Sequence, residues 1–184
     1  MNDRPGLRLR DLSRRARFGC KGPGAEDWLS GLGFRVPGGS NATAVEDRTL
    51  VARLATSEFL VEALAPGAPQ IQAARAALGA PNRPHSVYPV ARQDFVLDLR
   101  GPATVALLRQ ICSVDFAPAW MNAGADSGIV LTNMIGVGVV AWLKPDAREP
   151  ALTLWLDPSY GHYFWSTLLE IGRELEGGVA VDEP

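Results

Sequence analysis

The sequence predicts an α+β fold made of two similar strand–helix–strands–helix halves that share one core. Its length of 184 residues suits one large domain or two small halves packed together. Its composition, 47% hydrophobic and 21% charged, is that of a globular protein and excludes a wholly disordered chain. The third observation is an internal repeat. Lys21-Gly22-Pro23 and Arg100-Gly101-Pro102 lie 79 positions apart, counted from Gly22 to Gly101, and each precedes a helical pattern.

In each half, a predicted strand leads through the Gly-Pro pair into a helix. The strands are expected at residues 17–20 and 94–99. Glycine permits the sharp turn out of the strand, and proline suits the first helical turn because no N–H donor is needed there. The apolar helix faces are then Ala25, Trp28, Leu29 and Leu32 in the first half and Thr104, Leu107, Leu108 and Ile111 in the second.

Both halves continue with strands and close with a second helix. In the first half, strands at 49–54 and 58–64 precede a helix that begins at Pro69 and ends at Gly79. In the second half, strands at 129–132, 137–143 and 151–156 precede a helix over about 158–176. The predicted organisation is a first α+β half over 14–79, a linker over 80–86 and a second α+β half over 87–176.

The two chain ends are expected to lie outside these halves. Residues 177–184 are predicted to form a flexible tail, and residues 1–13 a basic N-terminal arm that is either solvated or docked on an acidic partner. The N-terminal region carries six arginines: Arg4, Arg8, Arg10, Arg14, Arg15 and Arg17. Asp3 and Asp11 interrupt them and no apolar segment follows Arg14-Arg15, so an export signal is not expected and the predicted location is cytoplasmic. The net charge of −2 and the lack of an apolar run of about 18 residues predict neither nucleic acid nor membrane as a partner.

Motifs of the kinds used in catalysis or cofactor binding have simpler structural interpretations in this sequence. Residues 136–141 match a loose dinucleotide-binding pattern, but these glycines lead into a β-branched run instead of a helix. Cys20 and Cys112 have no histidine nearby in sequence and are interpreted as small buried hydrophobes. His162 is interpreted as an exposed or capping residue. No two carboxylates fall at catalytic spacing in an apolar stretch. The sequence therefore predicts no catalytic, cofactor-binding or metal-binding residue in this chain.

Several motifs of the second half resemble the folate-binding aminomethyltransferase superfamily, which includes the T-protein of glycine cleavage. They are Arg100-Gly101-Pro102-Ala103, Leu107-Leu108, Cys112-Ser113-Val114-Asp115-Phe116 and Leu131-Thr132-Asn133-Met134-Ile135-Gly136. The paired repeat, the chain length and the segment from Trp155 to Trp165 make the chain similar to the gamma-subunit family of heterotetrameric sarcosine oxidase. The resemblance extends over about residues 14–176.

This resemblance implies a non-catalytic, structural gamma subunit that assembles with alpha, beta and delta subunits. The implied complex oxidises sarcosine to glycine and yields hydrogen peroxide with formaldehyde or methylene-tetrahydrofolate. FAD, FMN, NAD, tetrahydrofolate and zinc are implied for the other subunits and none for this chain. Three alternatives remain open. They are a stand-alone folate-binding protein of the aminomethyltransferase type, the gamma subunit of a related N-methyl amino acid dehydrogenase, and an interaction module of unrelated function.

One departure from the superfamily bears on this choice. In its enzymes, an acidic residue that binds the folate pterin follows the Asn-x-x-Gly stretch. In this chain the corresponding stretch is followed by Val137, Gly138, Val139 and Val140. Because a buried apolar strand supplies no proton acceptor, we expect the scaffold to be kept and the active site to be lost.

Three large side chains are predicted to contact a partner subunit. Trp120 and Met121 lie in a loop, residues 117–125, outside any regular pattern. Alternation along residues 151–156 places Trp155 on the face opposite the three leucines of that strand. Exposed aromatic side chains are costly to leave in water, and Trp is enriched in interface hot spots. The alternative is that helices of the same chain cover Trp155 and that the loop folds inward.

Overall fold

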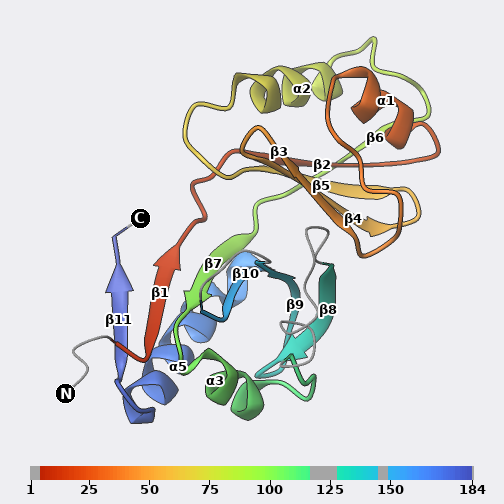
Figure 1. The fold of residues 1–184 in the computed structure, drawn as a ribbon. Helices are drawn as coiled ribbons and strands as arrows, with labels where there is room; N and C mark the ends of the chain where they lie inside the picture. The colour runs from red at the N-terminus through yellow and green to blue at the C-terminus, as the bar shows by residue number, and fades with distance from the viewer. Residues whose placement is uncertain (1–4, 117–127, 145–148, 184) are drawn as a thin grey trace. The chain divides into compact units, whose positions relative to one another are not determined.

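The computed structural model describes residues 5–116, 128–144 and 149–183, and the chain divides into two compact units (Figure 1). Unit 1 combines Met1–Ser13 with Gln93–Pro184, and unit 2 is Arg14–Arg92. The predicted α+β class is confirmed. The described elements, in chain order, are β1 (Leu7–Asp11), β2 (Arg17–Lys21), α1 (Ala25–Gly31), β3 (Thr43–Glu46), β4 (Thr49–Ala55), β5 (Glu58–Ala63), α2 (Pro69–Gly79), β6 (Tyr88–Val90), β7 (Phe95–Arg100), α3 (Thr104–Ile111), β8 (Ile129–Met134), β9 (Val137–Leu143), β10 (Ala151–Leu156), the 3₁₀ turn η1 (Pro158–Tyr160), α5 (Gly161–Glu174) and β11 (Val179–Asp182).

Unit 2 is a five-stranded sheet of order β3-β4-β5-β2-β6 with α1 and α2 on one face (Figure 1). Alternation along the strands sends one set of side chains toward these helices. Phe59 and Val61 of β5 pack there in a cluster that also holds Leu29 of α1 and Ile71 of α2. The spacing of Ile71, Ala74 and Leu78 places all three on the buried face of α2.

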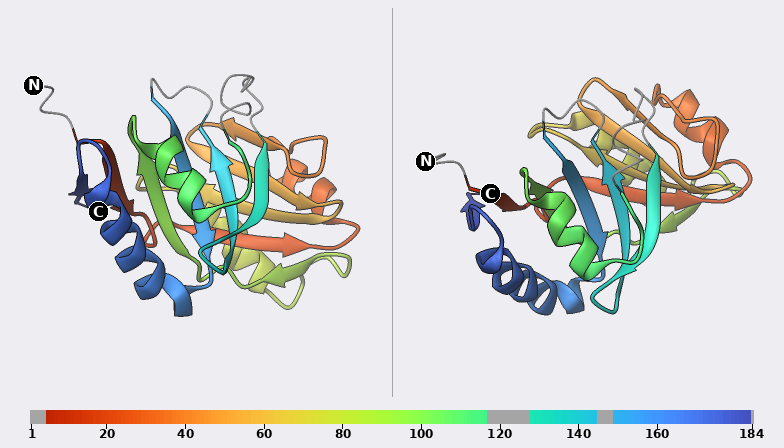
Figure 2. Two further views of the ribbon diagram at one scale, coloured as in Figure 1. Left: turned by 90° about the horizontal axis from the view of Figure 1, so that it is seen from below. Right: turned by 60° about the horizontal axis from the view of Figure 1, so that its bottom comes forward.

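Unit 1 is a six-stranded sheet of order β11-β1-β7-β10-β9-β8, and α3 and α5 lie on one of its faces (Figure 2). Leu97, Leu152 and Leu154 of the central strands pack against Leu107 of α3 and Phe164 of α5. Each unit thus has its own cluster of buried apolar residues against its helices, while other buried residues, such as Leu60, Val96 and Trp155, belong to neither cluster.

The repeat seen in the sequence is also present in the structure, down to the backbone turn. Gly22 and Gly101 have φ angles of +120° and +129°. A Cβ at either glycine would lie 2.3 Å from a carbonyl oxygen, of Ser86 for Gly22 and of Gly6 for Gly101. Only glycine fits such a turn without displacing the neighbouring backbone.

Equivalent strands also occupy equivalent places, but their order in the chain differs. In unit 2, β6 pairs antiparallel with β2, with Lys21 opposite Tyr88. In unit 1, β1 pairs antiparallel with β7 in the matching register, with Arg100 opposite Arg8. Each repeat therefore gives its first strand to the sheet of the other repeat.

This exchange corrects the predicted chain ends and boundaries. Residues 1–13 are not a free arm, because β1 pairs with β7 and with β11. Residues 177–184 are not a free tail either, because β11 pairs in parallel with β1 from Leu7↔Val179 to Arg10↔Asp182. The C-terminal part of unit 1 begins at Gln93, whereas the second half was predicted to begin at residue 87. The boundary differs because β6 belongs to the sheet of unit 2.

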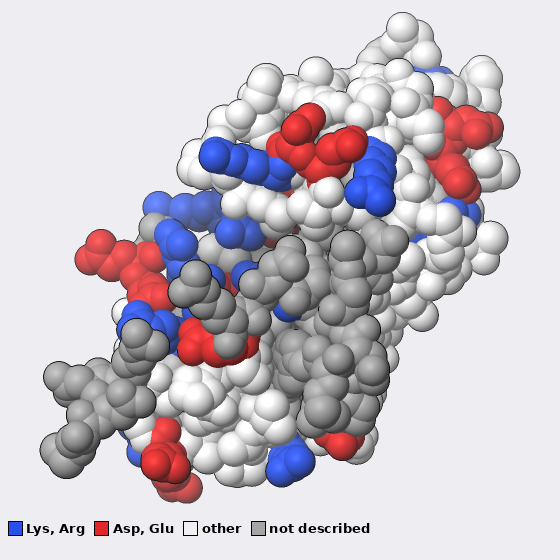
Figure 3. All heavy atoms as spheres, in the orientation of Figure 1, with Lys and Arg blue, Asp and Glu red and all other residues white. Residues whose placement is uncertain are grey.

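Charged side chains of both signs are interspersed on the face drawn in Figure 3. Several arginines that the sequence suggested as a basic arm are paired within the chain. Arg8 Nη1 lies 3.2 Å from Asp182 Oδ1, and Arg10 Nε donates to the carbonyl of Glu183 at 2.8 Å. Among the described residues, no helix is both long enough and apolar enough to cross a membrane.

Candidate functional site

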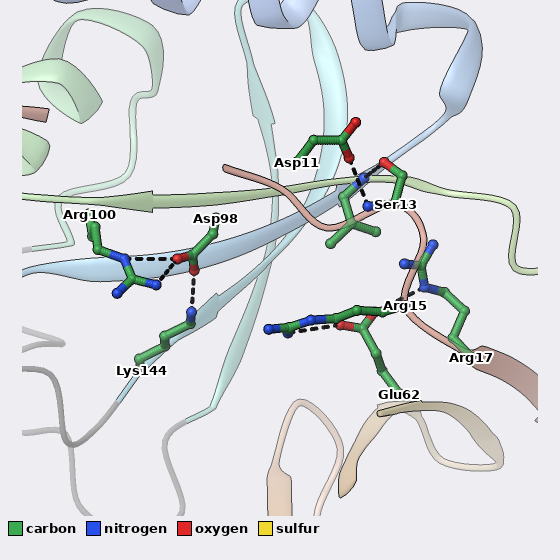
Figure 4. A network of polar contacts seen from close by, with 9 residues as sticks. Asp11, Ser13, Arg15, Arg17, Glu62, Asp98, Arg100 and Lys144 are labelled. Carbon is green, nitrogen blue, oxygen red and sulfur yellow. Dashed lines mark hydrogen bonds and ion pairs between the residues drawn. The ribbon is translucent and has the colours of Figure 1, made fainter. Parts of the chain in front are cut away.

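The most concentrated polar chemistry in unit 1 surrounds Asp98, whose side chain is fully buried on β7. Its carboxylate accepts from Arg100, with Arg100 Nε 2.9 Å from Asp98 Oδ2, and forms a second ion pair with Lys144 (Figure 4). Arg100 comes from the end of the same strand, while Lys144 follows β9. Alternation on β7 turns Leu97 and Leu99 into the core and sends Asp98 to the opposite face of the sheet.

This carboxylate is held in its ionised form. Burial raises the pKa of Asp98, but the charge and hydrogen bonds of Lys144 and Arg100 outweigh burial and hold that pKa below its ordinary value. The hydrogen bond to Asp98 in turn raises the pKa of Arg100. A general base needs a pKa near the working pH. Asp98 therefore fits a structural ion pair better than a proton acceptor.

A comparable cluster occurs in unit 2 around Glu62, which is fully buried on β5. Arg17 Nε donates to Glu62 Oε2 at 3.0 Å, and Arg15 Nη1 lies 3.5 Å from Glu62 Oε1 (Figure 4). The side chain of Arg17 is also buried, at 4% exposure. Buried charges persist when they are paired and hydrogen-bonded, which these contacts provide.

Trp155 was predicted to contact a partner, and this prediction is wrong, because its side chain is only 1% exposed. Alternation placed it correctly on the face opposite Leu152, Leu154 and Leu156. That face is itself buried on the central strands, however. Val96, directly opposite Trp155, is fully buried, and so is Thr153, which lies opposite Asp98. Trp120 and Met121 lie outside the described residues.

The hydroxyl of Thr153 is an exception to the pairing of buried polar groups. Its Oγ1 is buried and has no hydrogen-bond partner among the described residues, and the same holds for Thr104 on α3. Such an unpaired hydroxyl costs free energy, so it identifies a position where the fold is not optimised for stability.

The two cysteines differ in their surroundings. Cys20 is fully buried on β2, and burial, with the nearby charge of Glu58, raises its pKa to about 12. Its thiolate is therefore not populated at neutral pH. Cys112 is half-buried at the end of α3, where its Sγ lies 3.6 Å from Thr132 Oγ1. Cys20 thus behaves as the small buried hydrophobe that the sequence predicted.

The glycine pattern at residues 136–141 lies in a hairpin and not at the start of a helix. Ile135 and Gly136, with φ angles of +44° and +79°, form the turn between β8 and β9. Val137 and Val139 then point into the core of unit 1 at 3% and 4% exposure. The residues that follow the Asn-x-x-Gly stretch thus lie on a strand, where Val137 and Val139 pack in the core, Gly138 is exposed and Val140 is half-buried.

The remaining predicted polar residues are at the surface. His162 and Asp115 are exposed, and Glu26 on α1 pairs with Arg53 at 2.8 Å. A shallow polar depression in unit 2 is lined by Gly33, Phe34, Arg35, Glu46, Asp47, Thr49, Val51 and Gln70. In the part of the chain that the structure describes, no three His, Cys, Asp or Glu side chains gather as a metal site would require.

Sequence reasoning did not single out Asp98, Lys144 or Glu62. A signal was present for Asp98, because it is the one carboxylate within the apolar strand Phe95–Arg100, and for Lys144, because the chain has only one other lysine. The pairing itself was not readable, since Asp98 and Lys144 are 46 residues apart in sequence.

Comparison with known proteins shows similarity at the level of the fold. No family model matches the sequence, and no curated protein matches it either. Among solved structures, the chain is similar to a chain of the heterotetrameric sarcosine oxidase from Corynebacterium sp. U-96, solved with pyrrole 2-carboxylate. The TM-score is 0.69 and the sequence identity 21%, over 89% of this chain and 82% of that one.

A second similar structure is the glycine cleavage system aminomethyltransferase T from Bartonella henselae. The TM-score is 0.60 and the identity 18%, over 97% of this chain but only 48% of that one. This chain therefore spans about half the length of that enzyme. Both likenesses support the aminomethyltransferase-like fold predicted from the sequence.

Proposed function

We propose that this chain is a non-catalytic subunit of an amine-oxidising flavoenzyme complex of the heterotetrameric sarcosine oxidase type, with the structural role of its gamma subunit. The observation that carries the proposal is the share of both chains that the structural similarity covers. It covers 89% of this chain and 82% of a chain from such an oxidase. A match over most of both chains is what two subunits of the same kind give, although fold alone does not fix function.

The chemistry of the described residues supports the structural role. The most buried carboxylates, Asp98 and Glu62, are each engaged by two cations and are not placed to accept a proton from a substrate. Val139, which is buried, and Val140, which is half-buried, stand where the resemblance implies an acidic residue. Flavin, NAD, folate and zinc are accordingly assigned by this proposal to the partner subunits.

The proposal predicts that genes for two flavoprotein subunits lie beside this chain's gene, and co-expression with those subunits tests it. We expect a stable complex that contains this chain and produces hydrogen peroxide when sarcosine is added. Omitting this chain should lower the yield of assembled complex without changing the flavin spectrum of the subunits that remain. The isolated chain should be colourless and inactive. Stoichiometric flavin or sarcosine turnover in the pure single chain would overturn the proposal.

A second candidate is a folate-binding protein of the aminomethyltransferase type, favoured by the coverage of 97% of this chain on aminomethyltransferase T. Titration of the isolated chain with tetrahydrofolate in a calorimeter separates the two. The subunit proposal predicts weak or no binding, because Val139 and Val140 stand where the resemblance implies an acidic residue. Micromolar binding with one site per chain would favour the second candidate instead.

A further inference from the structure

Strand β1 is the first described element, and its described contacts lie within unit 1. It sits between β7 and β11 (Figure 1), and Leu7 and Leu9 are fully buried in the core of that unit. The carbonyl of Gly6 accepts from Ala103 N at 2.9 Å, and Leu7 N donates to the carbonyl of Gly178 at 3.0 Å. All of these partners belong to residues 93–184, so β1 completes a sheet made otherwise by the far end of the chain.

The connection from β1 to unit 2 is short. Leu12 N donates to Val96 O at 2.8 Å, and the Ser13 hydroxyl accepts from Val96 N at 2.9 Å, which fixes the chain to unit 1 as far as residue 13. Ala16 O accepts from Ala63 N at 2.9 Å, and Arg15 pairs with Glu62, so the chain already belongs to unit 2 there. Only Arg14, which is exposed, lies between the two anchors.

We infer that β1 is an exchangeable strand and that a second copy of this chain can supply it. In the resulting dimer, β1 of each chain completes the six-stranded sheet of the other. Every pairing of β1 is formed again with the same residues, so the two states differ only in the connector and in the entropy of association. The fold already exchanges equivalent strands between its two repeats, and a short hinge loop is the kind of connection at which such an exchange between two chains occurs.

Refolding at different protein concentrations tests this inference on the full chain. The chain is unfolded in denaturant and refolded at low concentration and at about a hundredfold higher concentration, because a dimer is favoured by mass action. Light scattering after gel filtration should give 19.7 kDa in the first case and twice that mass in a fraction of the second. The dimer should persist for hours after dilution, since its dissociation requires β1 to leave the sheet. A chain that remains monomeric at every concentration would overturn the inference, whatever the variants show.

A disulfide reports which chain supplies β1. Arg8 and Arg100 are opposite each other in register, and their side chains are 42% and 40% exposed. In an Arg8→Cys, Arg100→Cys variant that also carries Cys112→Ser, oxidation should link two chains in the dimer and close within one chain in the monomer. A dimer whose cysteines close only within each chain would show association without exchange and would contradict the inference.

The connector provides the matched control. Four Gly and Ser residues inserted after Arg14 leave every strand contact unchanged and let β1 return to its own sheet more easily. We expect the dimer fraction at high concentration to fall by about tenfold in this variant. An unchanged dimer fraction would show that the connector does not drive the exchange and would overturn this reasoning.

Discussion

Substitution of Gly101 tests whether the turn between β7 and α3 depends on glycine. With alanine at this position, the added Cβ would lie 2.3 Å from Gly6 O, 3.0 Å from Gly6 C and 3.1 Å from Leu7 Cα. All three are backbone atoms at the start of β1, so no flexible side chain can move away to make room. A φ of +129° is also one that side-chain-bearing residues rarely adopt.

The expected loss follows from these two effects. A residue forced into a sparsely populated backbone region costs about 1–3 kcal/mol. Displacing Gly6 also weakens the hydrogen bond from Ala103 N, which contributes about 0.5–1.5 kcal/mol. We therefore expect Gly101→Ala to lower the free energy of unfolding by about 2–4 kcal/mol. Gly22→Ala should behave alike in unit 2, because its Cβ would meet Ser86 O at the same 2.3 Å.

Two other glycines separate the effect of φ from that of crowding. Gly136 has a φ of +79° and open space around its Cβ position, so Gly136→Ala should cost only about 1 kcal/mol. At Gly138 no positive φ is present and the nearest atom is 3.8 Å away, so the change should be within about 0.5 kcal/mol. Urea unfolding followed by tryptophan fluorescence measures all four variants. If Gly101→Ala is no more destabilised than Gly136→Ala, the close approach to Gly6 is not what requires glycine.

Three further predictions concern buried polar and reactive groups. Asp98→Asn should lower the free energy of unfolding at neutral pH by about 1–3 kcal/mol. This loss is smaller than that for a fully buried ion pair, because the side chains of Lys144 and Arg100 are 21% and 40% exposed. The pKa of Asp98 is lower in the folded chain than in the unfolded chain. Its contribution to stability is therefore present above the pKa of the unfolded chain and is lost as the pH falls through the pKa of the folded chain. The difference from wild type should therefore shrink in acid unfolding curves, and a constant difference down to pH 2 would contradict the ion-pair assignment. Thr153→Val should be neutral or stabilising by up to about 1 kcal/mol in thermal unfolding, since it removes a buried hydroxyl without a partner, whereas a clear loss would show that the hydroxyl is bonded. Cys20, whose pKa is raised to about 12, should react with a thiol reagent only after unfolding, while Cys112 should react in the native chain. Equal native rates measured in the two single Cys→Ser variants would contradict this.

Local signals in the sequence were sufficient for most of the fold. The Gly-Pro pairs at 22–23 and 101–102 mark strand-to-helix turns, and such turns depend on the backbone of the residues themselves. Helix α2 was predicted at Pro69–Gly79, the bounds found in the structure, because its apolar spacing and its terminal residues agree. Elements of this kind are predictable because their stabilising contacts are close in sequence.

The strands that were not predicted depend on distant partners. In β1, Leu7 and Leu9 alternate with Arg8 and Arg10, which is a strand pattern, but the arginines suggested a solvated arm. Their partners lie on β7 and β11, at least 86 residues away (Asp11 to Leu97), and nothing local indicates them. Strand β6 contains Pro89, which is compatible only with an edge position and weakens the strand pattern.

The interface prediction failed at Trp155 for a related reason. Alternation decides which face a side chain occupies, but not whether that face is exposed. Thr153 and Asp157 lie on the same face as Trp155, and polar neighbours on one face of a strand usually indicate that this face is exposed to solvent. In the structure Thr153 is fully buried and lies beside the ion pairs of Asp98. Burial of both faces of a central strand is a property of the whole fold.

The place of β1 in the sheet also sets the order in which the nascent chain can become structured. Residues 7–11 leave the ribosome before both of their partner strands, because β7 is synthesised only from Phe95 and β11 only from Val179. Residues 14–92 are complete well before then, so unit 2 is able to form during translation. The sheet of unit 1 cannot be completed until β11 has been synthesised. Leu7 and Leu9 therefore remain without their sheet until β7 and β11 have been synthesised, and during that time they are an apolar segment that a chaperone can bind.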